Sequence, residues 1–300
     1  MTALTALVKR NVKVYFKDKG MFFSSLITPL ILLVLYATFL KKVYDDSFRA
    51  ALEEAGATVS DAVLNGCVGG QLISSLLAVS CVTVAFCSNL LMIKDKTSGA
   101  RHDLTMAPVS YGILGLGYYL ASLFSTLIIS FTAMAASFLY LAAVGWYLSF
   151  GDVVLLILDV LLLSMFGTAL SSVINFFLST DGQASAVGTV VSAGYGFVCG
   201  AYMPISNFGD GLQKVLGFLP GTYGTSLLGY QSLRGVFAQM SDAGFPPQVV
   251  DAIRDSVDCN LYFFGHGVSS LAMYLVLCGS ILLLVGVYVA LNIFVRKRRS

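Results

Sequence analysis

The chain contains a run of 48 residues, Leu104 to Gly151, without one charged side chain. Two more charge-free runs, Met21 to Leu40 and Ala62 to Ile93, precede it. A helix needs about 20 apolar residues to cross the roughly 30 Å of bilayer hydrocarbon. Charged residues make up only 11% of the 300 residues, too few to cover a soluble globule. These runs predict an all-α integral membrane protein.

The longest run cannot be a single span, because 48 helical residues would extend about 72 Å. It breaks best at Gly145 to Asp152, where two glycines, an aspartate, Trp146 and Tyr147 gather. A second polar break, Ser179 to Gly182, follows. We therefore expect six transmembrane helices, at about residues 21–40, 66–93, 112–144, 153–178, 183–203 and 267–295.

The distribution of basic residues predicts the orientation of the chain. With both termini in the cytosol, twelve of the 18 basic residues lie inside, in the first 20 residues, the loop 94–110 and the C-terminal Arg296 to Arg299. The other six are spread over longer outside segments. This arrangement follows the positive-inside rule for an even number of spans. Residues 204–265 are then expected outside, as short helices and a cap.

The first 20 residues have the pattern of a helix that lies in the membrane surface. Leu4, Leu7 or Val8, Val12 and Tyr15 recur at helical spacing, with basic residues around the rest of the helix. Such an amphipathic basic helix is typical of the bilayer interface.

Asp159 is the acid that falls inside a predicted span. An acid in a span is a candidate for proton or cation handling; alternatively, Asp159 lies in the outer part of the membrane, paired or hydrated. No metal site is predicted, because His102 and His266 fall on opposite sides of the membrane and the six cysteines show no C-x-x-C spacing. The same cysteine pattern predicts no disulfide framework.

The loop after the second span has a recognisable order of residues. Lys94 to Gly99 can turn the chain, and Arg101 to Met106 is long enough for a short helix before Pro108 stops it. Asp95, Gly99, Leu104 and Pro108-Val109-Ser110 together resemble the cytosolic loop of permeases of the ABC type-2 exporter superfamily. A second stretch, with Gly200, Pro204, Pro220 and Tyr223, resembles the segment after that family's fifth span.

The resemblance implies a division of labour between subunits. The helix in the loop would dock in a groove of a separate ATP-binding cassette ATPase, which holds ATP and Mg. The contacts expected from the resemblance are Gly99, Ala100, Arg101, His102, Asp103, Leu104, Met106 and Pro108. The chain itself contains no G-x-x-x-x-G-K-[ST] motif, so we expect a transport subunit without catalytic residues or a cofactor of its own.

The resemblance further implies two permeases, identical or sister chains, with the substrate path between them in a bacterial plasma membrane. After the fifth span it implies two short extracellular helices that dip back toward the lipid. No nucleic-acid partner is expected. Spans rich in Phe, Leu, Tyr, Ser, Thr and Gly suit an amphipathic or lipid-like cargo, such as a drug or antibiotic. A passive channel or secondary transporter that uses Asp159 is the alternative. An intramembrane enzyme is disfavoured, since the spans contain no His, Lys or Glu.

Overall fold

The computed structural model describes residues 2–54 and 60–297, and these are almost entirely helical. The helices are α1 (Ala3–Lys17), α2 (Lys19–Leu35), the π-helical η1 (Tyr36–Leu40), α3 (Lys41–Glu54), α4 (Asp61–Ser88), α5 (Leu90–Thr97), α6 (Ala100–Met106), α7 (Tyr111–Val144), α8 (Phe150–Phe177), α9 (Asp181–Val198), the 3-10 turn η2 (Ile205–Asn207), α10 (Asp210–Leu216), α11 (Pro220–Asp242), α12 (Pro247–Ser256) and α13 (Ser270–Lys297). The one sheet of the described residues is a hairpin of β1 (Tyr262–Phe263) and β2 (His266–Gly267).

Five helical segments of the described residues are long and apolar enough to cross a membrane. They are Lys19–Ala50, Asp61–Thr97, Tyr111–Val144, Phe150–Phe177 and Ser270–Phe294. The chain is therefore a multi-pass, all-α membrane protein. The predicted fifth span, 183–203, corresponds to α9, an 18-residue helix outside that set. Its four glycines, together with Asp181 and Gln183, lower its hydropathy, so the six-span layout stays a prediction.

Helix α4 is the centre of the bundle and packs against α2, α3, α7, α8, α9 and α11. Small residues let its neighbours approach closely. A Cβ added to Gly167 of α8 would lie 3.0 Å from Val82 Cα, and one added to Gly70 would lie 2.9 Å from the carbonyl oxygen of Ser232 in α11. Close backbone approach at small residues is how helices associate where lipid removes the hydrophobic driving force.

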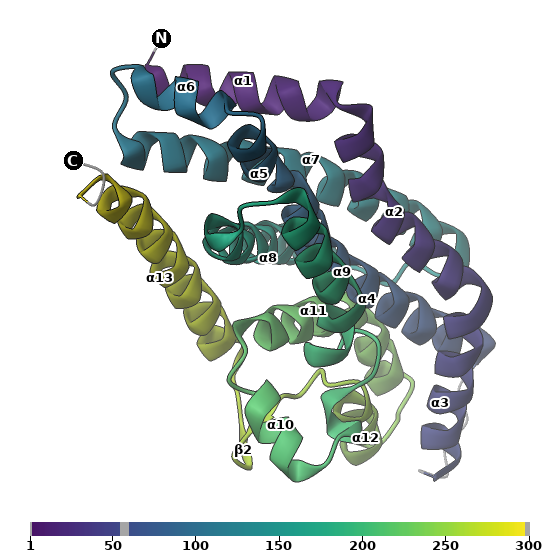
Figure 1. Ribbon diagram of the computed structural model, residues 1–300. Helices are drawn as coiled ribbons and strands as arrows, with labels where there is room; N and C mark the ends of the chain where they lie inside the picture. The colour runs from purple at the N-terminus through teal and green to yellow at the C-terminus, as the bar shows by residue number, and fades with distance from the viewer. Residues whose placement is uncertain (1, 55–59, 298–300) are drawn as a thin grey trace.

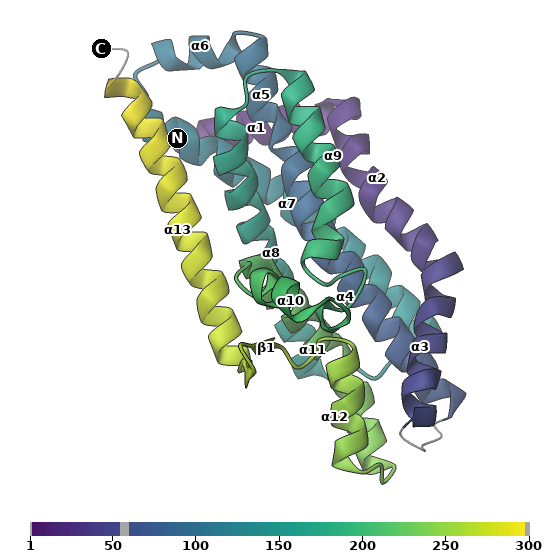
Figure 2. The same ribbon diagram turned by 60° about the horizontal axis from the view of Figure 1, so that its bottom comes forward.

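The two ends of the molecule differ in character (Figures 1 and 2). Helices α1 and α6 and the C-terminal end of α13 lie at one end, while α10, α12 and the hairpin lie at the other. Helix α1 runs across its end of the bundle and packs on α7 through Leu7, Asn11 and Tyr15. Helices α2 and α13 occupy opposite sides of the molecule.

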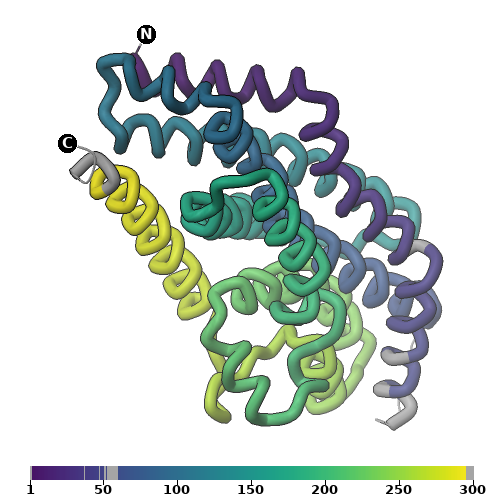
Figure 3. Tube along the Cα trace, in the orientation of Figure 1, coloured from purple at the N-terminus to yellow at the C-terminus, as the bar shows by residue number. Residues whose placement is uncertain are grey.

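The helix that holds the predicted first span does not end at Lys41 and Lys42. It continues through α3 along the same side of the molecule (Figure 3). Lysine and glutamate are good helix formers, and Tyr44, Phe48 and Leu52 recur every four residues as a buried stripe against α4. A run of charges therefore marks where the apolar stretch ends, without marking where the helix ends.

The segment after α9 differs from two short helices. Helix α10 is short, but α11 has 23 residues and packs between α4, α8 and α13. Its small residues, such as Gly221, Gly224 and Ser232, permit this close packing. The hairpin before α13 has no counterpart among the sequence predictions.

Candidate functional site

The loop 94–110 is folded as two helices at the α1 end of the bundle. Helix α5 follows α4 after Asn89, whose side chain donates hydrogen bonds to the hydroxyls of Ser171 (3.0 Å) and Ser172 (2.8 Å) in α8. Gly99 then adopts φ +82°, a left-handed conformation that glycine tolerates best, and α6 begins. The helix ends before Pro108.

Helix α6 presents an exposed surface. His102, Asp103, Met106 and Pro108 are exposed, and the Met106 side chain is 77% accessible. Ala100 and Arg101 are half-buried, and Leu104 packs from the inner side against a buried cluster that includes Leu7, Leu114 and Tyr288.

Asp95 connects this loop to two other helices. Its buried carboxylate pairs with the guanidinium of Arg10 in α1, with Nη2 3.1 Å from Oδ1 and Nη1 hydrogen-bonded to Oδ2. The Tyr118 hydroxyl of α7 donates to Oδ2 at 2.7 Å. The hydrogen bond to Asp95 raises the pKa of Arg10. A bidentate Arg–carboxylate pair fixes geometry as well as distance.

Lys96, one residue on, connects the loop to α8. Its ammonium donates to three carbonyl oxygens at the C-terminal end of α8, those of Asn175 (2.9 Å), Phe176 (2.8 Å) and Leu178 (2.8 Å). The last carbonyls of a helix have no partner within the helix, and the macrodipole makes this end negative. Lys96 supplies hydrogen-bond donors to these carbonyl oxygens and a positive charge at the negative end of the helix.

Two further contacts complete the connections of the loop. Arg101 Nη2 donates to Asn292 Oδ1 in α13 at 3.2 Å, and the Asn292 amide donates to the Tyr288 carbonyl oxygen at 2.9 Å. The ammonium of Lys94 lies 2.6 Å from the carboxylate of Asp18, which caps α2. Helices α5 and α6 are thus bonded to α1, α7, α8 and α13, and to the start of α2.

Sequence reasoning placed its coupling residues, 99–108, on this exposed element, but it missed the residues that hold the element in place. These are Arg10, Lys96, Tyr118 and Asn292. They come from distant parts of the sequence, and each makes a hydrogen bond that connects the loop to another helix. The unusual Asn292 within an otherwise apolar run, one turn before the C-terminal basic residues, is a signal that could have been followed.

The second motif lies at the opposite end of the bundle. Gly200, two residues after α9, has φ +77°, Pro204 precedes η2, and Pro220 is the first residue of α11. The Tyr223 hydroxyl is buried and donates to the Gly217 carbonyl oxygen at 2.6 Å. These residues shape the turns that carry the chain from α9 through α10 into α11, and the structure does not bring them near α6.

Asp159 is buried within α8 with 1% of its surface accessible. Its Oδ1 accepts a hydrogen bond from the Tyr274 hydroxyl of α13 at 2.6 Å, while Oδ2 has no partner among the described protein groups. Asp152 lies in the first turn of α8. It caps the helix together with Ser149, and its carboxylate lies 3.5 Å from the guanidinium of Arg234 in α11. The structure therefore pairs Asp159 with a neighbouring helix.

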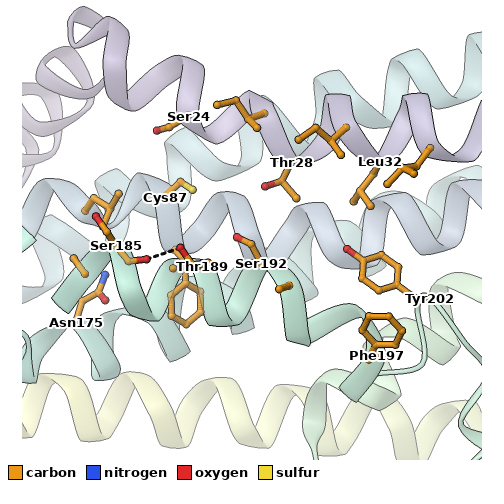
Figure 4. A pocket seen from close by; sticks show the side chains of 18 of the residues that line it. Ser24, Thr28, Leu32, Cys87, Asn175, Ser185, Thr189, Ser192, Phe197 and Tyr202 are labelled. Atoms are coloured by element: carbon orange, nitrogen blue, oxygen red, sulfur yellow. Dashed lines mark hydrogen bonds between the residues drawn. The ribbon is translucent and has the colours of Figure 1, made fainter. Parts of the chain in front are cut away.

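A cleft of about 820 Å³ lies between α2 and α9. Figure 4 shows Thr28 of α2 and Ser192 of α9 pointing toward the space between the two helices, with Cys87 of α4 behind them. The remaining lining is mostly aliphatic and aromatic, with further hydroxyls from Ser24 of α2 and from Ser185 and Thr189 of α9. Among the residues that the structure describes, neither Asp159 nor another charged side chain lines the cleft.

The other candidate chemistry is scattered. His102 on α6 and the hairpin residue His266 lie at opposite ends of the molecule (Figure 1). Within residues 2–54 and 60–297, no group of three or more His, Cys, Asp and Glu side chains could hold a metal ion, and all six cysteines are free thiols.

The model of a protein family described as "ABC-2 type transporter" matches residues 2–230. A comparison with curated proteins gives no match. The matched stretch includes α1, the loop with α5 and α6, and the helices from α2 through α9. Because the match extends over most of the chain and the apolar helices fit a membrane domain, the chain belongs to the ABC-2 type transporter family as a membrane-spanning permease component.

Proposed function

We propose that the chain is the permease subunit of an ATP-driven exporter and that a separate ATPase subunit docks on α6. The observation that carries this proposal is the combination at α6 of an exposed tip and a bonded base. His102, Asp103 and Met106 are free to contact a partner, while Arg101, Lys96 and Asp95 bond the same segment to the bundle. A surface without such connections could bind an ATPase but could not pass on its movement.

The contacts of the loop also indicate which helices would respond. A displacement of α5 acts on α1 and α7 through the Arg10–Asp95–Tyr118 cluster and on α8 through Lys96. A displacement of α6 acts on α13 through Arg101 and Asn292. Charged hydrogen bonds at partly buried positions resist being broken, so the helices move with the loop.

The cleft between α2 and α9 is our candidate for one half of the substrate path. Its apolar walls and scattered hydroxyls suit an amphipathic or lipophilic molecule without a fixed pattern of charge. Both bordering helices leave much surface uncovered, with Ile31 of α2 54% and Val190 of α9 71% accessible. A second permease, the same chain or a sister chain, would cover this side and close the path.

We further propose six spans, with α9 as the fifth and both termini in the cytosol of a bacterial cell. Eighteen helical residues extend about 27 Å, close to the hydrocarbon thickness. Helix α1 and the end of α13 lie at the α6 end of the bundle (Figure 2), which is consistent with the excess of basic residues there. A passive ion channel is less well supported, because none of the described residues that line the cleft carries a charge.

Co-purification tests the coupling. The permease is expressed with the ATPase encoded next to it, extracted in mild detergent and assayed for ATP hydrolysis. Asp103→Lys and Met106→Glu change exposed side chains without altering the base of the loop, whereas Gly99→Pro would disrupt the left-handed turn and is unsuitable. Asp242→Lys, which reverses an exposed carboxylate at the end of α11, is the matched control.

We expect the α6 variants to lose the ATPase while they elute as folded protein, and Asp242→Lys to retain it. If the wild type binds no ATPase and still moves solutes in vesicles, the exporter proposal is wrong. If Asp242→Lys loses the ATPase as fully as Asp103→Lys does, the loss is not specific to α6.

A further inference from the structure

Three phenylalanine rings, two of them exposed, form a cluster at the end of the molecule opposite α6. Phe218 follows α10, and Phe263 and Phe264 belong to the β1–β2 hairpin. Their ring centroids lie 4.7 Å apart for Phe263 and Phe264, 5.1 Å for Phe218 and Phe263, and 6.1 Å for Phe218 and Phe264. The Lys214 ammonium lies 5.9 Å from the Phe264 centroid. We call these three rings and Lys214 the aromatic cluster.

The cluster is built, although much of it is exposed. Gly217 makes room for it, because a Cβ there would lie 2.9 Å from the Phe263 ring. Yet Phe218 is 65% and Phe264 56% accessible. Edge-to-face rings that remain open to water gain little from burial, so the arrangement indicates a covering environment.

The backbone of the hairpin also indicates a covering environment. Phe263 pairs with His266, so Phe264 and Gly265 are the two turn residues, and both have positive φ (+51° and +81°). Asn, Asp and Gly suit such turns, while a bulky side chain at positive φ is strained. Phe264 is thus held at a position where its backbone and its exposure are both unfavourable in water.

The hairpin leads directly into α13, which fixes its depth. Counted from Val295, just before the terminal basic residues, about 20 residues of hydrocarbon depth reach Val276. The helix begins at Ser270, about 9 Å further out if the helix is upright. Leu271 and Leu275 in this stretch are 70% and 66% accessible, so the apolar outer face of α13 continues to the hairpin.

We propose that the aromatic cluster is a lipid-contact surface that sits in the headgroup layer of the outer leaflet. Aromatic side chains concentrate at this depth in membrane proteins, and a lysine beside them can reach lipid phosphates. A second copy of the chain is a less suitable occupant. The proposed pairing of two permeases uses the side of α2 and α9, whereas the cluster adjoins α13 on the opposite side of the molecule from α2 (Figures 1 and 2). The contact would anchor α10 and the first turn of α13 to the bilayer.

The single tryptophan of the chain allows a direct test. Trp146→Phe provides a background without tryptophan, into which Phe264→Trp or Phe218→Trp is introduced. Each full-length variant is reconstituted in vesicles of phosphatidylcholine carrying bromine either next to the headgroup or deep in the acyl chain. Leu282→Trp on the exposed face of α13 (75% accessible) and Met106→Trp on α6 are controls for the deep membrane and for water.

We expect both cluster tryptophans to lose more fluorescence to shallow than to deep bromine, Leu282→Trp to show the reverse order, and Met106→Trp to be unaffected. If the cluster tryptophans are unquenched and emit in the red, the cluster faces water. If they are unquenched and emit in the blue, a protein surface covers it. Either result would overturn the proposal.

A second measurement does not depend on tryptophan. Phe264→Asn places a residue suited to positive φ at the turn, so the melting temperature in detergent should hold or rise. The gain in melting temperature on transfer from detergent to lipid should shrink relative to wild type, while the exposed neighbour His266→Asn leaves that gain unchanged. An unchanged gain for Phe264→Asn contradicts the proposal. The assignment to the outer leaflet rests on the proposed orientation, whereas the order of shallow and deep quenching does not. The quenching result and the ATPase co-purification can therefore contradict their own proposals separately.

Discussion

Arg10 of α1 and Asp95 of α5 lie 85 residues apart in the sequence and form a two-pronged ion pair, to which Tyr118 of α7 adds a third hydrogen bond. The Asp95 carboxylate is 7% accessible and the Arg10 side chain 34%. The helix that lies across the end of the bundle is therefore fixed to the base of the α5–α6 loop by charge, in addition to the apolar contacts of Leu7 and Tyr15.

Arg10→Gln should destabilise the protein and weaken coupling. It leaves the buried Asp95 carboxylate without its cation, and the expected loss is about 1–2 kcal/mol, the lower part of the range for a buried unpaired group because Arg10 itself is partly solvated. Lys9→Gln, an exposed basic residue of the same helix, is the control. Thermal unfolding in detergent measures the difference; equal melting temperatures for the two variants would contradict the role of the pair.

Lys96→Met should separate the loop from α8. Three carbonyl oxygens at the C-terminal end of α8 lose their donor, so we expect faster amide hydrogen exchange in the last turn of α8 and reduced ATPase stimulation. Lys94→Met removes a neighbouring exposed lysine and should leave that turn protected. Equal exchange in both variants would show that Lys96 does not cap α8.

The sequence predicts the parts of this molecule that obey a local rule. The apolar runs gave helices close to α7, α8 and α13, and the glycine and proline at residues 99 and 108 bracket α6. It failed where distant residues decide the outcome. The continuation of α2 into α3 depends on Tyr44, Phe48 and Leu52 meeting α4, and the burial of α11 depends on its own small residues meeting α4, α8 and α13.

The same limit applies to the site. Residues 99–108 could be proposed because they are contiguous, and the resemblance to a family supplied their role. The groups that hold α6 come from α1, α5, α7 and α13, and no spacing in one sequence brings Arg10 to Asp95 or Arg101 to Asn292. The cleft likewise forms where α2 and α9, distant in the sequence, lie on either side of Cys87 of α4.

Gly167→Ala should cost more than an ordinary helical substitution. The added methyl group would lie 3.0 Å from Val82 Cα and 3.2 Å from the Cys81 carbonyl oxygen, both backbone atoms of α4 that cannot rotate away. We expect a loss of about 1–3 kcal/mol. Gly286→Ala in α13, which meets nothing within 4 Å, should be neutral or stabilising. A chemical unfolding series distinguishes the two, and similar losses at both positions would argue against tight α4–α8 packing.

Asp18 should make a small, pH-dependent contribution to the α1–α2 junction. The hydrogen bond from Lys94, followed by that from the Met21 amide, lowers the pKa of Asp18. A carboxyl group whose pKa is lower in the folded state stabilises that state fully above the unfolded value of about 3.9, and the stabilisation is lost as pH falls through the folded pKa.

Solvent screens this pair, so we expect only a few tenths of a kcal/mol between wild type and Asp18→Asn near neutral pH. Because Asn also caps helices, the substitution removes the charge while it keeps the cap. The difference in unfolding free energy should shrink as the pH falls below about 3.9 and disappear below the folded pKa of Asp18. A difference that persists or grows in acid would show that Asp18 does not act through the charge of Lys94.

Substitutions of Asp159 distinguish a structural acid from a transport acid. Asn can accept the Tyr274 hydrogen bond through its side-chain oxygen, so Asp159→Asn should unfold within about 0.5 kcal/mol of wild type. Asp159→Val leaves the Tyr274 hydroxyl without its acceptor and should lower the unfolding free energy by about 1–3 kcal/mol. Tyr274→Phe removes the donor of the same hydrogen bond. If Asp159 only joins α8 to α13, Asp159→Asn also keeps substrate transport in vesicles. A folded Asp159→Asn variant that no longer transports would show that the carboxyl group takes part in transport itself, by carrying a proton or a cation.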